Sequence, residues 1–80
     1  MTTEEIAAVL AKARWVRSMG GTSEGFRVAR TAEGVIVSWV TPAWNVRTRD
    51  RMLGNYEQTL KDRGYQVTRH KDYLVVTGKK

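Results

Sequence analysis

The chain predicts an α+β fold of two layers, in which two helices cover one face of a four-stranded, largely antiparallel sheet. Two segments, 3–18 and 49–63, repeat apolar residues at helical spacing. Four shorter segments, separated by turn residues, are rich in β-branched and aromatic residues: 25–31, 35–41, 65–70 and 73–77. The predicted order is therefore helix, hairpin, helix, hairpin.

The chain has the length of one domain, and residues 1–80 are expected to form a single one. A chain of this size buries only about 60% of the surface that it exposes when unfolded. One modest core is expected, and a second domain is excluded.

The first helix is expected over residues 3–18. Thr2 and Glu5 have the spacing of a capping box at its start. A glycine pair, Gly20-Gly21, is expected to end it, with Arg14 and Arg17 in the last turn. Its apolar stripe comprises Ile6, Val9, Leu10, Ala13 and Val16.

Trp15 lies about half a turn from this stripe, on a flank with Ala8 and Ala11. Small alanines allow close approach, so we expect this flank to pack against the second helix near Gly54. If it does not pack there, Trp15 is an exposed anchor for a partner.

The first hairpin is expected to turn through Ala32, Glu33 and Gly34, with Gly34 as the left-handed residue of a three-residue loop. Side chains alternate between the two faces of a strand. This register places one set toward the helices: Phe26, Val28, Ile36 and Val40. It places the other set on the opposite face: Arg27, Ala29, Val35, Val37 and Trp39. A register that differs by one residue would exchange the faces.

The second helix is expected to begin after Thr48 as N-cap and to end before Gly64 as the C′ residue. Its buried stripe comprises Met52, Leu53, Tyr56 and Leu60. The second hairpin is expected to turn at Lys71-Asp72. Its helix-facing residues are Tyr65, Val67, Leu74 and Val76, and the opposite face carries Gln66, Thr68, His70, Tyr73, Val75 and Thr77.

The uncovered sheet face is therefore expected to show an apolar surface comprising Val35, Val37, Trp39, Tyr73 and Val75. An exposed surface of this kind, rimmed by polar groups, usually marks an interface. Trp39 and Tyr73 could stack on unpaired bases while Arg27 meets phosphate. Alternatively, the same face pairs with its own copy or with a partner protein, for which Trp, Tyr and Arg are the usual anchors.

The formal net charge of +6 is unevenly distributed. Residues 1–40 hold five basic and four acidic side chains, whereas residues 41–80 hold nine and four, a net charge of +5. Nucleic acid, an anionic surface or an acidic protein is the natural partner of such a chain. The alternative is that the charge serves only solubility.

The segment 44–51 places Trp44 beside Arg47, Arg49 and Arg51 at the start of the second helix. Backbone N–H groups and arginine side chains at a helix start suit a phosphate. The alternative is that Trp44 folds against the core edge while the arginines are solvated or pair with Asp50.

Catalytic and metal-binding signatures are missing from the sequence. It contains no cysteine and one histidine, His70, which excludes a disulfide framework and a thiolate or paired-histidine metal site. Gly20 and Gly25 have the spacing of a phosphate loop, but Phe26-Arg27 stands where Lys-Ser/Thr is required. We therefore expect no enzyme activity, no metal and no cofactor.

The first residues are acidic and polar, unlike a secretion signal. The longest apolar run, Ile6–Ala11, is far shorter than the roughly 20 residues that span a bilayer. A soluble, cytoplasmic protein with no membrane partner is expected.

The last 30 or so residues resemble the ends of short accessory proteins of actinobacteria and their phages. The resemblance rests on Tyr56–Val67, which reads YEQTLKDRGYQV, and on Tyr73–Thr77, which reads YLVVT. It implies a small accessory protein and transfers no functional residue.

These observations predict a small, basic, non-catalytic binding module, foremost one that binds nucleic acid. The alternative is a protein-interaction or self-associating module, such as a homodimer or a phage factor that binds a host protein. Either partner would be contacted by one set of residues: Arg27, Trp39, Trp44, Arg47, Arg49, Arg51 and Tyr73.

Overall fold

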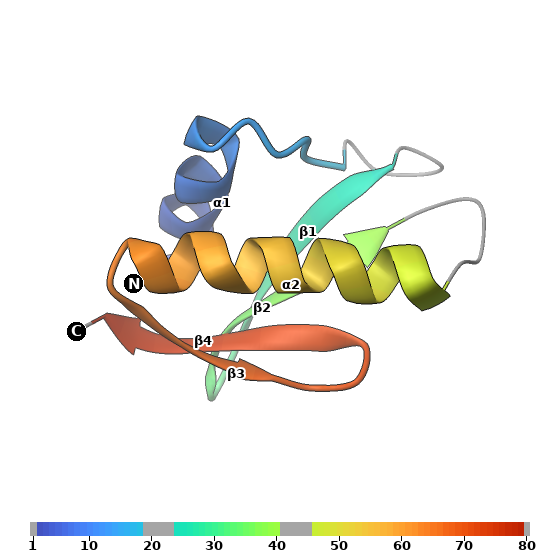
Figure 1. Cartoon of the computed structure of the whole chain (residues 1–80). Coiled ribbons are helices and arrows are strands. Elements are labelled where there is room, and N and C mark those ends of the chain that lie inside the picture. The colour runs from blue at the N-terminus through green and yellow to red at the C-terminus, as the bar shows by residue number, and fades with distance from the viewer. Residues whose placement is uncertain (1, 19–23, 41–45, 80) are drawn as a thin grey trace.

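The computed structural model describes residues 2–18, 24–40 and 46–79 (Figure 1). Its elements are α1 (Thr3–Lys12), β1 (Gly25–Thr31), β2 (Gly34–Val40), α2 (Val46–Asp62), β3 (Tyr65–Arg69) and β4 (Tyr73–Lys79). The predicted α+β fold and the order α-β-β-α-β-β are confirmed.

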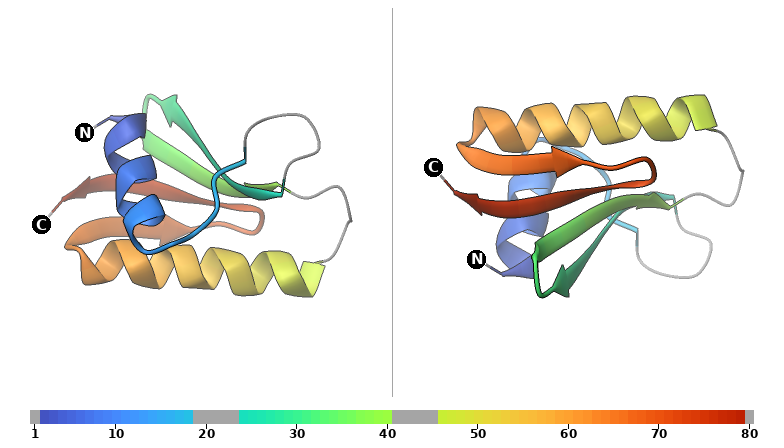
Figure 2. Two further views of the ribbon diagram at one scale, coloured as in Figure 1. Left: turned by 90° about the horizontal axis from the view of Figure 1, so that it is seen from above. Right: turned by 90° about the horizontal axis from the view of Figure 1, so that it is seen from below.

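The four strands form one antiparallel sheet with the order β1-β2-β4-β3. Both helices pack on the same face: seen from below, α1 lies behind the strands and α2 runs along the β3 side of the sheet (Figure 2). No described element covers the opposite face, which we call the open face. The predicted two-layer architecture is therefore confirmed.

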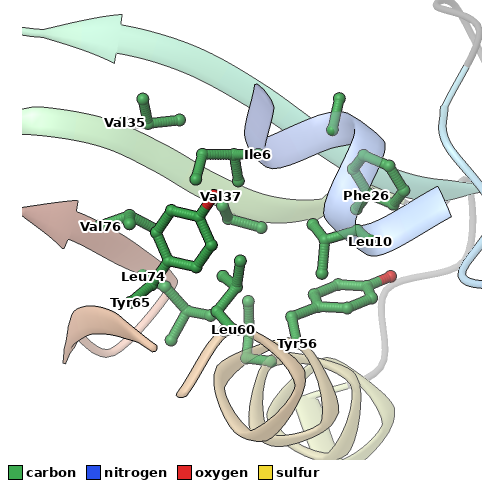
Figure 3. Close-up of a cluster of buried hydrophobic side chains, with 12 residues drawn as sticks. Ile6, Leu10, Phe26, Val35, Val37, Tyr56, Leu60, Tyr65, Leu74 and Val76 are labelled. Atoms are coloured by element: carbon green, nitrogen blue, oxygen red, sulfur yellow. The ribbon is translucent and has the colours of Figure 1, made fainter. Parts of the chain in front are cut away.

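The core lies between the helices and the sheet (Figure 3). Its largest fully buried side chains come from α1, α2 and three of the strands: Tyr56, Phe26, Ile6, Leu10, Leu53, Leu60, Leu74, Val35, Val37 and Val76. Tyr65 joins this cluster from β3, and its hydroxyl donates a hydrogen bond of 2.7 Å to Glu5 on α1. Apolar burial thus joins the two helices to the sheet.

Helix α1 begins as predicted and ends earlier than predicted. The Thr2 hydroxyl accepts a hydrogen bond from the Glu5 N–H at 3.1 Å. The helix stops at Lys12, because Arg14 adopts the left-handed conformation with φ +70°. The Trp15 N–H then bonds to the Leu10 carbonyl at 3.1 Å, which is the Schellman arrangement that usually contains glycine.

The early end of α1 overturns the expected role of the residues that follow. Val16 is 67% exposed, and Arg17 pairs with Glu4 at 3.1 Å instead of lying in a last helical turn. The Phe26 N–H donates to the Val16 carbonyl and the Ser18 N–H donates to the Phe26 carbonyl, so this segment runs along the edge of β1. The expected glycine stop at Gly20-Gly21 lies outside the described residues.

The register of the first hairpin differs by one residue from the prediction. Gly34 pairs with Thr31, so the loop contains only Ala32 and Glu33. Gly34 has the positive φ that favours glycine (+148°), but it belongs to β2, and an added Cβ would lie 2.1 Å from the Val76 carbonyl oxygen. Close packing against β4, rather than a left-handed loop position, requires glycine here.

This register reverses the predicted faces of β2. Trp39 pairs with Phe26 and Val37 with Val28, so all four point toward the helices. The prediction that Val35, Val37 and Trp39 lie on the uncovered face is therefore wrong. The open face instead carries Ile36, Ser38 and Val40 from β2, beside Tyr73 and Val75, whose predicted side is confirmed. The prediction that Val75 is exposed there is wrong, because its side chain is buried among its neighbours.

Helix α2 begins at Val46, so Thr48 lies inside the first turn and is not the N-cap. A contact with the sheet overrides the local capping signal: Arg49 pairs with Asp72 at 2.9 Å and fixes this turn to the β3–β4 loop. The other end agrees with the prediction, because Gly64 has φ +89° and its N–H bonds to the Lys61 carbonyl. Leu53, Tyr56 and Leu60 are buried as predicted, and Met52 is half-buried.

Candidate nucleic-acid interface

One end of the molecule gathers much of the positive charge. At this end β1 begins, β2 ends, the β3–β4 loop turns and α2 starts (Figure 2). We call it the basic end and define it by Arg27, Arg47, Arg49, Arg51, Arg69 and Lys71. Its nearby carboxylates are Glu24, Asp50, Asp72 and Glu57, the last 3.7 Å from Arg69. Among the described residues, these six cations therefore face four carboxylates.

Two of these arginines hold the fold together. Arg49 is 16% exposed and contacts Asp72 at 2.9 Å and Asp50 at 3.7 Å. Arg69 donates to the Asp50 carbonyl at 2.9 Å and lies 3.7 Å from Glu57. Among Arg47, Arg49 and Arg51, the expected pairing with Asp50 is found for Arg49. Its contacts tie α2 to the β3–β4 loop.

The other four cations of the basic end remain available to a partner. Arg27, Arg47, Arg51 and Lys71 are exposed, and none makes an ion pair or side-chain hydrogen bond within the described part of the chain. The first turn of α2 also contains no acidic residue. The positive end of the helix dipole therefore adds to the field of Arg47 and Arg51.

A pair of stacked rings lies on the open face at the basic end. His70 and Tyr73 flank the β3–β4 turn, with ring centroids 4.7 Å apart and planes inclined by 16°. Tyr73 pairs with Ser38, and Ser38 pairs with Arg27, so the three residues form one row across β4, β2 and β1. Two strand spacings separate Tyr73 from Arg27, about 10 Å.

Trp39 lies on the helix side of the same end and lines a half-open cavity of about 420 Å³. The walls come from the segment after α1, from the ends of β1 and β2 and from α2: Arg14, Trp15, Val16, Glu24, Gly25, Trp39, Met52 and Tyr56. We call this the aromatic cavity, because two tryptophans and a tyrosine form much of its wall.

Trp15 is held at the cavity wall by α2. Its indole N–H donates to the Thr59 hydroxyl at 2.9 Å, and its ring meets that of Tyr56 edge-to-face with centroids 5.8 Å apart. The expectation that Trp15 packs against the second helix is confirmed, but its contacts there are Tyr56 and Thr59. The expected contact near Gly54 is wrong, because Gly54 instead faces Arg69.

Tyr56 is fully buried, yet its hydroxyl has no hydrogen-bond partner among the residues that the structure describes. Figure 3 shows its ring extending from α2 toward Leu10 and Phe26. Burial, and after it the negative charge of Glu24, together raise the pKa of Tyr56 to about 12. The Glu24 carboxylate therefore acts on this hydroxyl from the cavity side.

The structure brings five of the seven predicted site residues to the basic end: Arg27, Arg47, Arg49, Arg51 and Tyr73. Trp39 lies at the same end but on the helix side, and Trp44 lies outside the described residues. The sequence interpretation missed His70, Lys71 and the cavity wall. His70 and Tyr73 flank a two-residue turn, and that spacing was a usable signal for a cross-strand ring pair.

The described residues contain no group of three or more His, Cys, Asp or Glu side chains that could hold a metal ion. Within those same residues, no helix is long and apolar enough to cross a membrane. Comparison with protein-family models, curated proteins and solved structures finds no match.

Proposed function

We propose that this chain is a non-catalytic module that binds single-stranded nucleic acid at its basic end. The observation that carries the proposal is the stacked His70–Tyr73 pair in the same cross-sheet row as Arg27. The exposed cations Arg47, Arg51 and Lys71 lie at the same end. Stacking rings beside unpaired cations is the combination by which single strands are held without sequence readout.

Each part of this row has a separate role. An unpaired base stacks on the half-buried ring of Tyr73, which His70 supports from the other side of the turn. Arg27 receives a phosphate of the same strand across Ser38. Arg47, Arg51 and Lys71 attract the flanking phosphates and increase the rate of association.

The geometry favours single strands over duplexes. Stacking on Tyr73 requires a base that is not enclosed in a double helix. No described helix projects from the open face in the manner of a helix that enters the major groove.

Fluorescence polarisation with labelled single-stranded and duplex DNA of about 12 nucleotides, within the usual site size, tests the proposal. Binding of the single strand should weaken steeply between about 50 and 200 mM salt, because each phosphate contact releases counterions. Replacing both rings (His70→Ala and Tyr73→Ala) should lower affinity by about tenfold or more, since each stacked base contributes about 1–3 kcal/mol.

The charge variant is Arg47→Glu with Arg51→Glu, which spares Arg49 and its contact with Asp72. Its matched control is Arg30→Glu with Arg63→Glu, because these exposed arginines lie near the end of β1 and after the end of α2, and neither makes an ion pair with another described residue. The Arg47→Glu, Arg51→Glu variant should nearly abolish binding. The Arg30→Glu, Arg63→Glu variant should weaken binding only slightly, through its lower net charge. Equal losses from both pairs, or no binding at low salt, would refute the proposal.

A second candidate is protein interaction or self-association through the open face. It is favoured by the apolar neighbours Ala29 and Ile36 on adjacent strands of the open face; Val75 continues their row but is only 2% exposed and adds little contact surface. Ile36→Asp should then shift a dimer to monomer in sedimentation equilibrium and leave nucleic-acid affinity nearly unchanged. A wild-type chain that is monomeric at all concentrations would exclude self-association.

A further inference from the structure

We infer that the aromatic cavity receives one unpaired base of the bound strand and that guanine fits it best. This inference rests on the proposed function. It identifies the chemical group that binds on the helix side of the sheet. It assigns a role to Trp39, which the open face cannot use, because Trp39 points toward the helices.

The size and walls of the cavity suit a single base. Its volume of about 420 Å³ is at the lower end of the range for small-molecule sites, which is roughly 300–1,000 Å³. Trp15 and Trp39 offer ring faces or edges, and Met52 adds a polarisable wall. A planar aromatic ligand gains most from such walls, because stacking tolerates any base.

The unpartnered Tyr56 hydroxyl provides an independent indication of a ligand. A buried hydroxyl without a partner is costly and rare. Trp15 and Phe26 both contact the ring edge-to-face, which fixes the position of Tyr56. The hydroxyl is a donor in need of an acceptor, but it is fully buried, so a wall side chain of the cavity must first move aside before a base carbonyl can accept this hydrogen bond.

The rim residues determine which base fits. Arg14 is a donor and Glu24 is an acceptor; both are exposed, and neither is paired with the other. Guanine presents a carbonyl oxygen beside N–H donors on one edge. The carbonyl oxygen can accept from Arg14 and Tyr56, and the N–H groups can donate to the Glu24 carboxylate. Arg14 holds this position through its left-handed backbone (φ +70°), a conformation that glycine would adopt with less strain.

The cavity is close to the phosphate-binding residues along the chain. Trp39 pairs with Phe26, which precedes Arg27, and Met52 follows Arg51. A strand held by Arg27 and Arg51 can therefore present one base to the helix side.

Titration of the full chain with guanosine, adenosine, cytidine and uridine 5′-monophosphates, followed by tryptophan fluorescence, tests the inference. The four probes share one phosphate, so their differences report the base. Guanosine monophosphate should bind at least about fivefold more tightly than each of the others, since a hydrogen bond to a buried group is worth a factor of that order. Equal binding of all four would refute the choice of guanine, and no binding would refute the cavity site.

Three variants separate a binding role from a structural one. Tyr56→Phe should weaken guanosine monophosphate about five- to tenfold while the melting temperature stays equal or rises, because only an unpaired hydroxyl is lost. Arg14→Gly should likewise raise the melting temperature and weaken binding. Glu24→Gln should reduce the preference for guanosine over adenosine monophosphate, whereas Glu33→Gln at the opposite end should not.

The outcomes distinguish this inference from the proposed function. Salt-sensitive binding of a single strand without any mononucleotide binding would overturn the cavity site and leave the proposed function standing. Guanosine monophosphate binding without single-strand binding would overturn the proposed function and retain the cavity as a nucleotide site. Unchanged affinity in Tyr56→Phe and in Arg14→Gly would remove these residues from the site and overturn the inference.

Discussion

Tyr56 combines a fully buried ring with a polar group that finds no partner in the described part of the chain. Its ring extends from α2 toward Leu10 and Phe26 (Figure 3), whereas its hydroxyl accepts and donates no hydrogen bond there. A phenylalanine would satisfy the same packing without a buried polar atom. The hydroxyl therefore has no evident structural use within the described chain.

Stability should depend on pH through Tyr56 in a defined window. The unfolded tyrosine ionises near its ordinary pKa of about 10, whereas burial keeps the folded one protonated to a pKa of about 12. The folded state then binds more protons, so the free energy of unfolding should fall as pH rises from about 10 to 12. Urea titrations of wild type and Tyr56→Phe at pH 8 and pH 11 check this, and an equal fall in both would contradict it.

At the scale of elements, the end of α1 is the least expected feature. A left-handed residue other than glycine costs about 1–2 kcal/mol, and Arg14 occupies such a position. The Schellman hydrogen bonds at Arg14 and Trp15 and the packing of Trp15 against α2 offset this cost. The helix therefore ends where Trp15 can reach Thr59.

Arg14→Gly is expected to stabilise the fold by about 0.5–1 kcal/mol, less than the full cost because glycine also gains entropy when unfolded. The melting temperature should rise by several degrees for a domain of this size. Ala11→Gly, in the last turn of the same helix, is the matched control and should destabilise by up to about 1 kcal/mol. A fall in the melting temperature of Arg14→Gly would show that the arginine side chain stabilises the cap.

The elements show which features the sequence could predict. Thr2, Gly64 and the Lys71-Asp72 turn were recognisable, because capping and turn formation depend on residues close in sequence. The end of α1 and the start of α2 were not, because Trp15–Thr59 and Arg49–Asp72 join residues distant in sequence. The predicted faces of β2 were reversed because the loop before it is one residue shorter than expected. Gly34 belongs to the strand because the Val76 backbone approaches it closely, and the sequence carries no signal of that contact.

The candidate site was predictable in composition more than in arrangement. The excess of basic residues in the second half of the chain and the position of Tyr73 on the uncovered face were predicted from sequence. The division between structural and available arginines did not, because it depends on which arginine reaches Asp72. The aromatic cavity depends on Trp39 pointing inward, which followed only from the observed register.

At the scale of the whole molecule, the antiparallel sheet brings separate charges together. The strand order places the start of β1, the end of β2 and the β3–β4 loop at one end, and the Arg49–Asp72 ion pair adds the start of α2. Arg27, Arg47, Arg51 and Lys71 thereby lie at one end of the molecule although they span much of the sequence. Under the proposed function, a strand bound at this end would contact both faces of the sheet.

The measurement that tests this account most directly is the mapping of backbone amide shifts in ¹⁵N-labelled chain during titration with an unlabelled single strand of about 12 nucleotides. Shifts should concentrate at the basic end, around Arg27, Trp39, Arg47–Met52 and His70–Tyr73. The opposite end, around Arg30 to Gly34 and Arg63, should stay unchanged. Shifts centred on that opposite end, or no shifts at low salt, would contradict the account.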